Sequence, residues 1–101
     1  MRGVPSVMRA AVVRAFRGPE VVRVAGNVPV PKLAPDEVLI RVAAASVSPL
    51  DTRVRSGYAA ALFAPMLPLI LGRDVSGTVV ALGTNARAFR IGAEVFGALS
   101  P

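Results

Sequence analysis

The chain contains no cysteine and no histidine among its 101 residues. Without cysteine it can form no disulfide, no thiolate zinc site and no cysteine nucleophile. Without histidine it lacks the commonest general base near neutral pH and the commonest metal ligand. The sequence therefore excludes cysteine- and histidine-based catalysis, and it predicts that no zinc is bound.

Long apolar runs and aromatic residues are also scarce. The apolar stretch from Ala59 to Leu71 is too short to cross a bilayer, and Pro65 and Pro68 interrupt it. We therefore expect no membrane span and interpret this stretch as a loop that lines the core. The chain has one tyrosine, four phenylalanines and no tryptophan, which is too few for a platform on which nucleic-acid bases could stack.

Positive charge is in excess but is not clustered. The formal net charge is +6, from eleven arginines and Lys32 against six acidic residues spread along the chain. Proteins that bind nucleic acids usually gather their basic residues on one face. The spacing here predicts a basic, solvated surface and no nucleic-acid partner.

The remaining composition indicates one small, sheet-rich domain. Hydrophobic residues make up 53% of the chain, mostly valine and alanine, and only 18% of residues are charged. We expect a hairpin from strands at 8–16 and 21–25 around the turn 17–20, and an extended edge or linker at 28–31. Later strands are expected at 38–47, 75–82 and 94–98. Residues 1–7 are interpreted as an N-terminal extension.

One short helix is expected at residues 49–56. Ser48 suits the N-cap, Pro49 suits the first helical position, and Gly57 is a stop signal. Asp51 lies where a carboxylate meets the positive end of the helix. A short helix after several strands indicates a β-barrel-like fold.

A polar pair opens the strand at 75–82. Two adjacent charged residues stand at the start of this apolar strand, in the run Leu71-Gly72-Arg73-Asp74-Val75-Ser76-Gly77. Charged side chains at the edge of a buried sheet are typical of a cleft. The alternative is that Arg73 and Asp74 form a structural ion pair at the sheet edge. We favour the structural role for Arg73 and leave both roles open for Asp74.

Several ordered motifs resemble the start of medium-chain dehydrogenase/reductases. These are Arg9-Ala10-Ala11-Val12-Val13, Gly18-Pro19-Glu20-Val21, Pro35-Asp36-Glu37-Val38-Leu39-Ile40-Arg41-Val42, the run at residues 71–77 described above, and Ile91-Gly92-Ala93-Glu94-Val95-Phe96-Gly97. The chain is most similar to the zinc-free quinone oxidoreductase branch. Within that branch, Arg55-Ser56-Gly57-Tyr58 and Leu67-Pro68-Leu69-Ile70 resemble the mitochondrial reticulon-interacting oxidoreductases.

The resemblance implies a fold and a cofactor. It implies a mainly β, partial GroES-like barrel over residues 8–101, the N-terminal part of the family's catalytic domain. It also implies NADPH and a quinone or enone substrate, a homodimer for full-length relatives, and a mitochondrial location, with the cytoplasm as the alternative. The sequence has no Gly-x-Gly-x-x-Gly loop for a dinucleotide pyrophosphate, so NADPH is not expected to bind this chain alone.

The resemblance also implies candidate pocket residues. Ser48 stands where relatives carry an asparagine that faces the nicotinamide and the substrate, and Asp51 and Tyr58 match pocket positions. Asp74 stands where zinc-dependent relatives have the acidic residue of Gly-His-Glu. Each residue also has a structural alternative: an N-cap for Ser48, a helix-start carboxylate for Asp51, a loop-surface residue for Tyr58, and the ion pair for Asp74.

Two functions from different classes remain. The first is the pocket wall of a zinc-independent, NADPH-dependent quinone or enone oxidoreductase, inactive without a cofactor-binding half. The second is a non-catalytic binding or structural module that keeps the barrel surface. Either way, we expect the isolated chain to be marginally stable and sticky, because sheet edges would be exposed.

Overall fold

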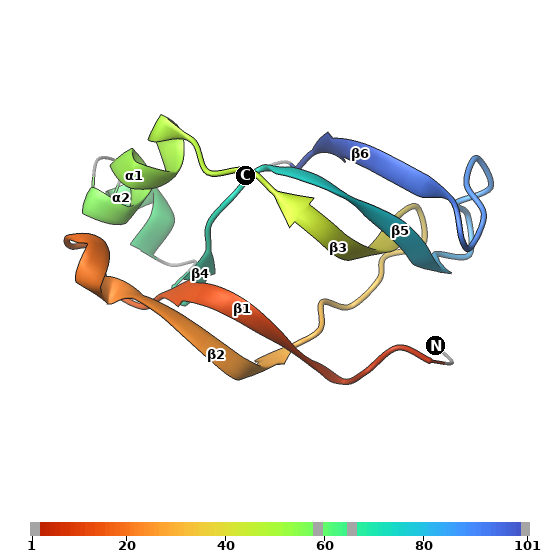
Figure 1. The fold of residues 1–101 in the computed structure, drawn as a ribbon, viewed down its shortest axis with the longest axis horizontal. Coiled ribbons are helices and arrows are strands. Elements are labelled where there is room, and N and C mark those ends of the chain that lie inside the picture. Colours follow the sequence, from red (N-terminus) through yellow and green to blue (C-terminus); the bar gives the residue numbers. More distant parts are fainter. Residues whose placement is uncertain (1–2, 58–59, 65–66, 100–101) are drawn as a thin grey trace. The chain divides into compact units, whose positions relative to one another are not determined.

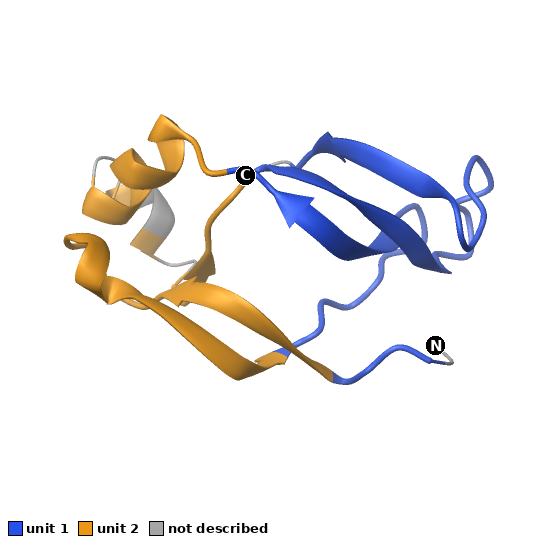
Figure 2. Ribbon diagram, viewed as in Figure 1, with its two compact units in different colours: residues 1–6, 29–46, 73–101 blue, residues 7–28, 47–72 orange. Residues whose placement is uncertain are grey.

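The structure is a computed structural model, and it describes residues 3–57, 60–64 and 67–99. The chain divides into two compact units (Figure 2). Unit 1 contains residues 1–6, 29–46 and 73–101, and unit 2 contains residues 7–28 and 47–72. The two units are described separately below.

Unit 1 is built on an antiparallel sheet of three strands (Figure 1). The strands are β3 (Val38–Ala45), β5 (Asp74–Leu82) and β6 (Glu94–Ala98), in the order β3-β5-β6. β3 pairs with β5 through two register shifts, at Leu39/Ile40 and at Val42/Ala44. β6 pairs with β5 over five consecutive residues, from Glu94 opposite Thr78 to Ala98 opposite Asp74. The predicted strands at 38–47, 75–82 and 94–98 are confirmed within a few residues.

Gly77 is required where β5 approaches β3. A Cβ at this position would collide with the Arg41 carbonyl oxygen and the Ile40 side chain. The glycine lets the two backbones come together beside the second register shift. It therefore helps to fix how β3 and β5 pair.

Unit 2 contains a second three-stranded sheet and the helices. The sheet has the order β2-β1-β4, from β1 (Val7–Val13), β2 (Val22–Pro29) and β4 (Leu69–Ile70). The 3₁₀ turn η1 (Pro19–Val21) joins β1 to β2, as the turn signal predicted. The helices are α1 (Pro49–Ser56) and the four-residue α2 (Ala60–Phe63).

Three details differ from the sequence-based expectation. α2 and β4 both fall within 59–71, which was interpreted as a loop, so the fold has more than the one expected helix. β2 continues to Pro29, on an edge where its missing N–H costs no ladder bond. β1 starts at Val7, and the Ser6 carbonyl accepts a hydrogen bond of 3.0 Å from Val30 N. The last two residues of the expected N-terminal extension, Ser6 and Val7, are therefore part of the folded structure.

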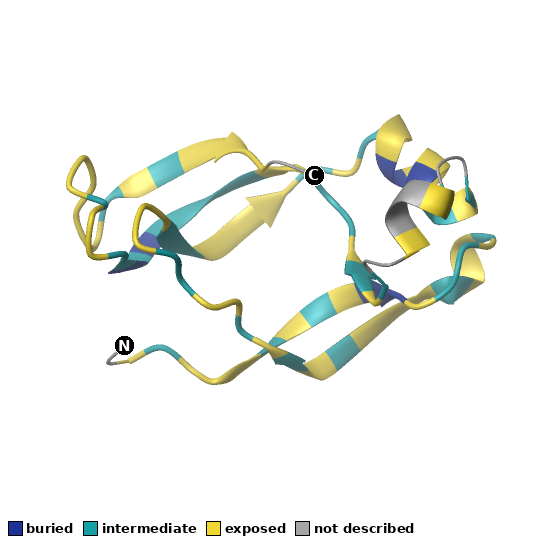
Figure 3. Ribbon diagram, turned by 180° about the vertical axis from the view of Figure 1, so that it is seen from behind, coloured by how far each residue is buried: buried dark blue, intermediate teal, exposed yellow. Residues whose placement is uncertain are grey.

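The buried apolar core is small in each unit (Figure 3). In unit 2 it comprises Val12, Val13 and Val54, and in unit 1 it comprises Val79 and Ala81. Large apolar side chains such as Ile91 and Phe96 are exposed. No helix in the described part of the chain is long and apolar enough to span a membrane.

Candidate functional site

The start of α1 is formed by the residues that the sequence predicted. Ser48 has extended backbone angles at the N-cap, Pro49 begins the helix, and Gly57 ends it with a left-handed φ of 103°. Ser48 N donates a hydrogen bond of 2.9 Å to Asp51 Oδ2, which is the carboxylate half of a capping box. The helix-start roles of Ser48 and Asp51 are therefore present in the structure.

Asp51 also binds a distant part of unit 2. Its Oδ1 accepts a hydrogen bond of 2.9 Å from Gly72 N, 21 residues further along the chain. Ser48 Oγ lies 3.4 Å from Oδ2 and donates to it. Asp51 is only 7% exposed, so both carboxylate oxygens are used inside the protein. A buried carboxylate with several N–H and O–H donors is satisfied, and it fixes the position of the groups that donate to it.

Gly72 is the second anchor of this network. Its φ of 103° lies in the left-handed region that favours glycine. The Asp51 carboxylate holds this turn directly before the Arg73-Asp74 pair in the sequence. Sequence reasoning placed Gly72 in a family motif but did not predict its bond to Asp51, because the contact is not local.

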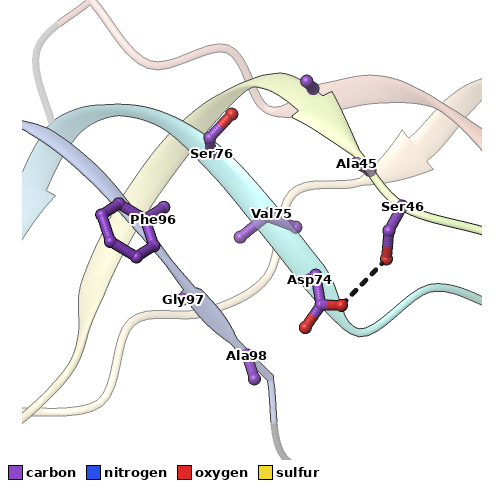
Figure 4. A pocket seen from close by; sticks show the side chains of 9 residues that line it. Ala45, Ser46, Asp74, Val75, Ser76, Phe96, Gly97 and Ala98 are labelled. Carbon is purple, nitrogen blue, oxygen red and sulfur yellow. Dashed lines mark hydrogen bonds between the residues drawn. The ribbon is translucent and has the colours of Figure 1, made fainter.

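Asp74 begins β5 in unit 1 and is exposed. Its Oδ2 accepts a hydrogen bond of 3.2 Å from Ser46 Oγ, just beyond the end of β3 (Figure 4). The backbone supports this pair, since Ser46 N donates to the Asp74 carbonyl at 3.0 Å. Arg73 Nε donates instead to the Leu99 carbonyl at 3.5 Å. The two side chains thus bond to different partners rather than forming the expected structural ion pair.

A shallow hollow of about 550 Å³ surrounds the Ser46–Asp74 pair (Figure 4). Small side chains form most of its lining, and Phe96 is the one aromatic residue in it: Ala44, Ala45, Ser46, Asp74, Val75, Ser76, Phe96, Gly97 and Ala98. A second hollow of about 490 Å³ shares Ser76 and Phe96 and extends to Thr78 and Glu94. An apolar floor with a carboxylate at one end suits a small, flat organic molecule that carries a polar group.

The predicted site residues are thus divided. The structure joins Ser48 to Asp51 in unit 2 and places Asp74 with Ser46 in unit 1. Tyr58 lies outside the described residues. Ser46 and Phe96 were not predicted as site residues. Ser46 follows the last residue of β3, and only the pairing register of β3 with β5 shows that this position lies beside Asp74. Among the described residues, no three histidine, cysteine, aspartate or glutamate side chains gather as a metal site would need.

A family model for the alcohol dehydrogenase GroES-like domain matches residues 34–100. The chain belongs to this family. The match includes β3, α1, β5 and β6, and so contains both Ser–Asp pairs. The mainly β fold, with two open three-stranded sheets in the described residues, is that of a partial GroES-like domain.

Relatives of this GroES-like chain are oxidoreductases. It is 38% identical over 109 aligned residues to the mitochondrial NAD(P)H oxidoreductase RTN4IP1 of Bos taurus, with 95% of this chain and 28% of the relative covered. It is 42% identical over 90 residues to the quinone oxidoreductase of Homo sapiens, with 89% and 27% covered. These relatives include a quinone oxidoreductase and RTN4IP1, the two groups that the motifs indicated.

Solved structures give the same result. The quinone oxidoreductase of Coxiella burnetii superimposes with a TM-score of 0.85 at 35% identity, covering 91% of this chain and 29% of that one. The Escherichia coli quinone oxidoreductase, solved in complex with NADPH, gives a TM-score of 0.81 at 27% identity, covering 92% and 27%. The family thus includes NADPH-dependent members. The GroES-like chain spans less than a third of the length of each of these relatives.

Proposed function

We propose that residues 8–101 form the GroES-like part of a zinc-independent, NADPH-dependent quinone or enone oxidoreductase, where they wall the substrate pocket. The observation that carries this proposal is the hollow in unit 1, whose one carboxylate, Asp74, is held by Ser46. Its mostly apolar lining, with few polar groups, matches a conjugated carbonyl compound better than a sugar or a phosphate. The relatives named as quinone oxidoreductases support this substrate class.

The pocket residues would act by binding and orientation. Asp74 would accept a hydrogen bond from a hydroxyl group of a reduced or hydroxylated substrate. Tyr58 would donate a hydrogen bond to the substrate carbonyl. Asp51 would act through its neighbours, since both of its oxygens are already bonded to Ser48 and Gly72.

Ser48 would contact the nicotinamide of the cofactor through its hydroxyl group. Its hydroxyl hydrogen is donated to Asp51, and the capping box uses its oxygen as an acceptor for the Asp51 N–H. The second lone pair of this oxygen would accept an N–H of a nicotinamide carboxamide. NADPH, when bound, would supply the hydride that reduces the conjugated substrate. The glycine-rich loop that holds the pyrophosphate would come from another segment, because this sequence has none. A mitochondrial location and a homodimeric assembly would follow if the resemblance to RTN4IP1 extends that far.

A chimaera tests the proposal. Residues 8–101 would replace the matching segment of human quinone oxidoreductase, and NADPH oxidation would be followed with a panel of quinones and enones. We expect quinone-dependent turnover by the chimaera, and neither turnover nor saturable NADPH binding by the 101-residue chain alone. Asp74→Ala in the chimaera should raise KM more than it lowers kcat.

The control experiment establishes that the chimaera is folded and binds NADPH. Far-UV circular dichroism, a single melting transition and NADPH binding would show that the chimaera is folded. A folded, NADPH-binding chimaera that reduces no quinone or enone would contradict the proposed function. Turnover by the 101-residue chain alone would contradict the assignment of the cofactor site to another segment.

A further inference from the structure

The carboxylate of Asp51 faces three hydrogen-bond donors within unit 2. Its Oδ2 accepts from Ser48 N at 2.9 Å and lies 3.4 Å from Ser48 Oγ, and its Oδ1 accepts from Gly72 N at 2.9 Å. An ionised carboxylate has only acceptors, so each group that faces it must turn a hydrogen toward it. The two backbone N–H groups have a fixed direction. The Ser48 hydroxyl is therefore the one donor of the three whose direction the carboxylate decides.

The Ser48 hydroxyl group is held on two sides. It has one hydrogen and two lone pairs, and the hydrogen rotates to suit its neighbours. In the capping box, Ser48 Oγ accepts the Asp51 N–H, which uses one lone pair. The 3.4 Å contact with Oδ2 is long, but a negative charge attracts the hydrogen and repels a lone pair, so the hydroxyl donates toward the carboxylate. One lone pair is left, and toward any further group Ser48 acts only as an acceptor.

The Asp51 carboxylate cannot turn away from Ser48 without breaking other bonds. Asp51 is only 7% exposed, so rotation of its side chain would leave the Ser48 and Gly72 N–H groups without a partner. α1 is also held near its other end, because Arg55 Nη1 donates to the Arg17 carbonyl at 2.6 Å. The carboxylate is therefore fixed in unit 2, and the direction of the Ser48 hydroxyl is fixed with it.

Asparagine at position 51 would reverse the direction of this hydroxyl at almost the same volume. An amide has an oxygen acceptor on one side and two N–H donors on the other. With the amide oxygen accepting from Gly72 N, the amide N–H groups would face Ser48 Oγ and use its second lone pair. The hydroxyl hydrogen would then point outward, and Ser48 would act as a donor. The charge of Asp51, rather than its size, therefore makes Ser48 an acceptor.

We propose that Asp51 is a positioning residue that keeps Ser48 an acceptor, and that Ser48 thereby selects a dinucleotide whose nicotinamide ring carries an N–H donor. The carboxamide of NADPH has such a donor, whereas a ring with a methyl ketone in the same place has none. A cofactor without the N–H would leave the Ser48 lone pair without its hydrogen bond. The inference rests on the proposed function, because it requires Ser48 to contact the nicotinamide.

Competitive binding to the chimaera tests the inference without turnover. NADPH binding would be followed by its fluorescence, and the reduced 3-acetylpyridine analogue of NADPH, in which a methyl ketone replaces the carboxamide, would be the competitor. The measured quantity is the selectivity ratio, the dissociation constant of the analogue divided by that of NADPH. Ser48→Ala and Asp51→Asn should each lower this ratio by about fivefold, the effect of one hydrogen bond. The double variant should have the ratio of Ser48→Ala, since Asp51 acts through Ser48.

Asp51→Glu separates the charge of this residue from its shape. Glutamate is the usual partner of a serine N-cap in a capping box, so it keeps a negative charge beside Ser48. Its extra methylene disturbs the buried contact with Gly72, so the melting temperature should fall. We expect the selectivity ratio of Asp51→Glu to stay within about twofold of that of the unsubstituted chimaera. A purely structural role for Asp51 predicts instead that the ratio follows the melting temperature in both variants.

Asp36→Asn is the matched control, since it makes the same substitution at an exposed carboxylate in a turn of unit 1 and should leave the ratio unchanged. Circular dichroism and a single melting transition would establish that each variant is folded. If Asp51→Asn does not fold, a ratio that is retained in Asp51→Glu and lowered in Ser48→Ala supports the inference, and any other pattern overturns it.

The inference would be overturned by an unchanged selectivity ratio in folded Asp51→Asn, by loss of selectivity in Asp51→Glu, or by an equal effect of Asp36→Asn. Each of these outcomes leaves NADPH binding by the chimaera intact, so the proposed function would stand. A folded chimaera that binds no NADPH would instead contradict the proposed function and the inference together.

Discussion

Two Ser–Asp pairs in this chain use the same chemical groups in opposite surroundings. Asp51 is buried, receives three hydrogen bonds and joins the start of α1 to the Gly72 turn. Asp74 is exposed, and its carboxylate accepts one hydrogen bond from a described side chain, the Ser46 hydroxyl at 3.2 Å. The first carboxylate has no free acceptor directed outward, whereas the second can still accept from a ligand. Burial and the number of donors, rather than residue type, separate a structural aspartate from a candidate binding one.

Asp51→Ala should have the largest effect on stability. It removes the acceptor for Ser48 N and Gly72 N and leaves both donors without their partner. We expect a loss of about 2–4 kcal/mol in the free energy of unfolding, measured by urea denaturation. If the variant is too unstable to measure, hydrogen exchange of the Gly72 amide in Asp51→Asn provides the readout, and this amide should exchange faster. A loss below about 0.5 kcal/mol in the alanine variant would show that Asp51 is not the structural member of the two.

Ser48→Ala should have an intermediate effect. The backbone N–H at position 48 still donates to Asp51, but the N-cap hydroxyl and its 3.4 Å contact are lost. We expect a destabilisation of about 1 kcal/mol in the same urea experiment. Ser48→Asn should recover most of this loss because asparagine is also a good N-cap. Failure of asparagine to recover stability would argue against the N-cap role.

Asp74→Ala should have the smallest effect on stability, within about 0.5 kcal/mol, because the side chain is exposed and its contact with Ser46 is long. Its effect should instead appear in substrate binding by the chimaera described above. Ser46→Ala is the matched variant, since it removes the same bond but keeps the carboxylate. A destabilisation by Asp74→Ala as large as that by Asp51→Ala would remove the distinction between the two pairs.

The parts of the fold that local sequence signals determine were predicted well. Ser48, Pro49 and Gly57 predicted both ends of α1, and the run from Glu94 to Ala98 predicted β6. The elements α2 and β4 were missed. β4 has only two residues, and it exists because Ile70 and Leu69 pair with Val12 and Val13, which lie more than 50 positions earlier in the chain. No local pattern carries that information.

The candidate site shows the same limit. Family motifs pointed to Ser48, Asp51 and Asp74, and helix-start rules gave the local role of Asp51. The bond from Asp51 to Gly72 and the bond from Asp74 to Ser46 connect residues that are 21 and 28 positions apart. Both depend on how strands and turns meet in space, which residue spacing alone does not determine. The exposed ring of Phe96 was missed for a similar reason, since an aromatic residue in an apolar strand is expected to be buried.

The division of the chain into interleaved segments affects how it can be made and cut. The backbone passes from one unit to the other after residues 6, 28, 46 and 72. Neither unit is therefore a continuous piece of sequence, and no single truncation yields one of them intact. β5 cannot complete its pairing with β3 until the intervening residues 47–72 have been looped out, so assembly requires closure of a sizeable loop. During synthesis, the N-terminal strand must wait for residues 69–70 to leave the ribosome before its sheet is complete.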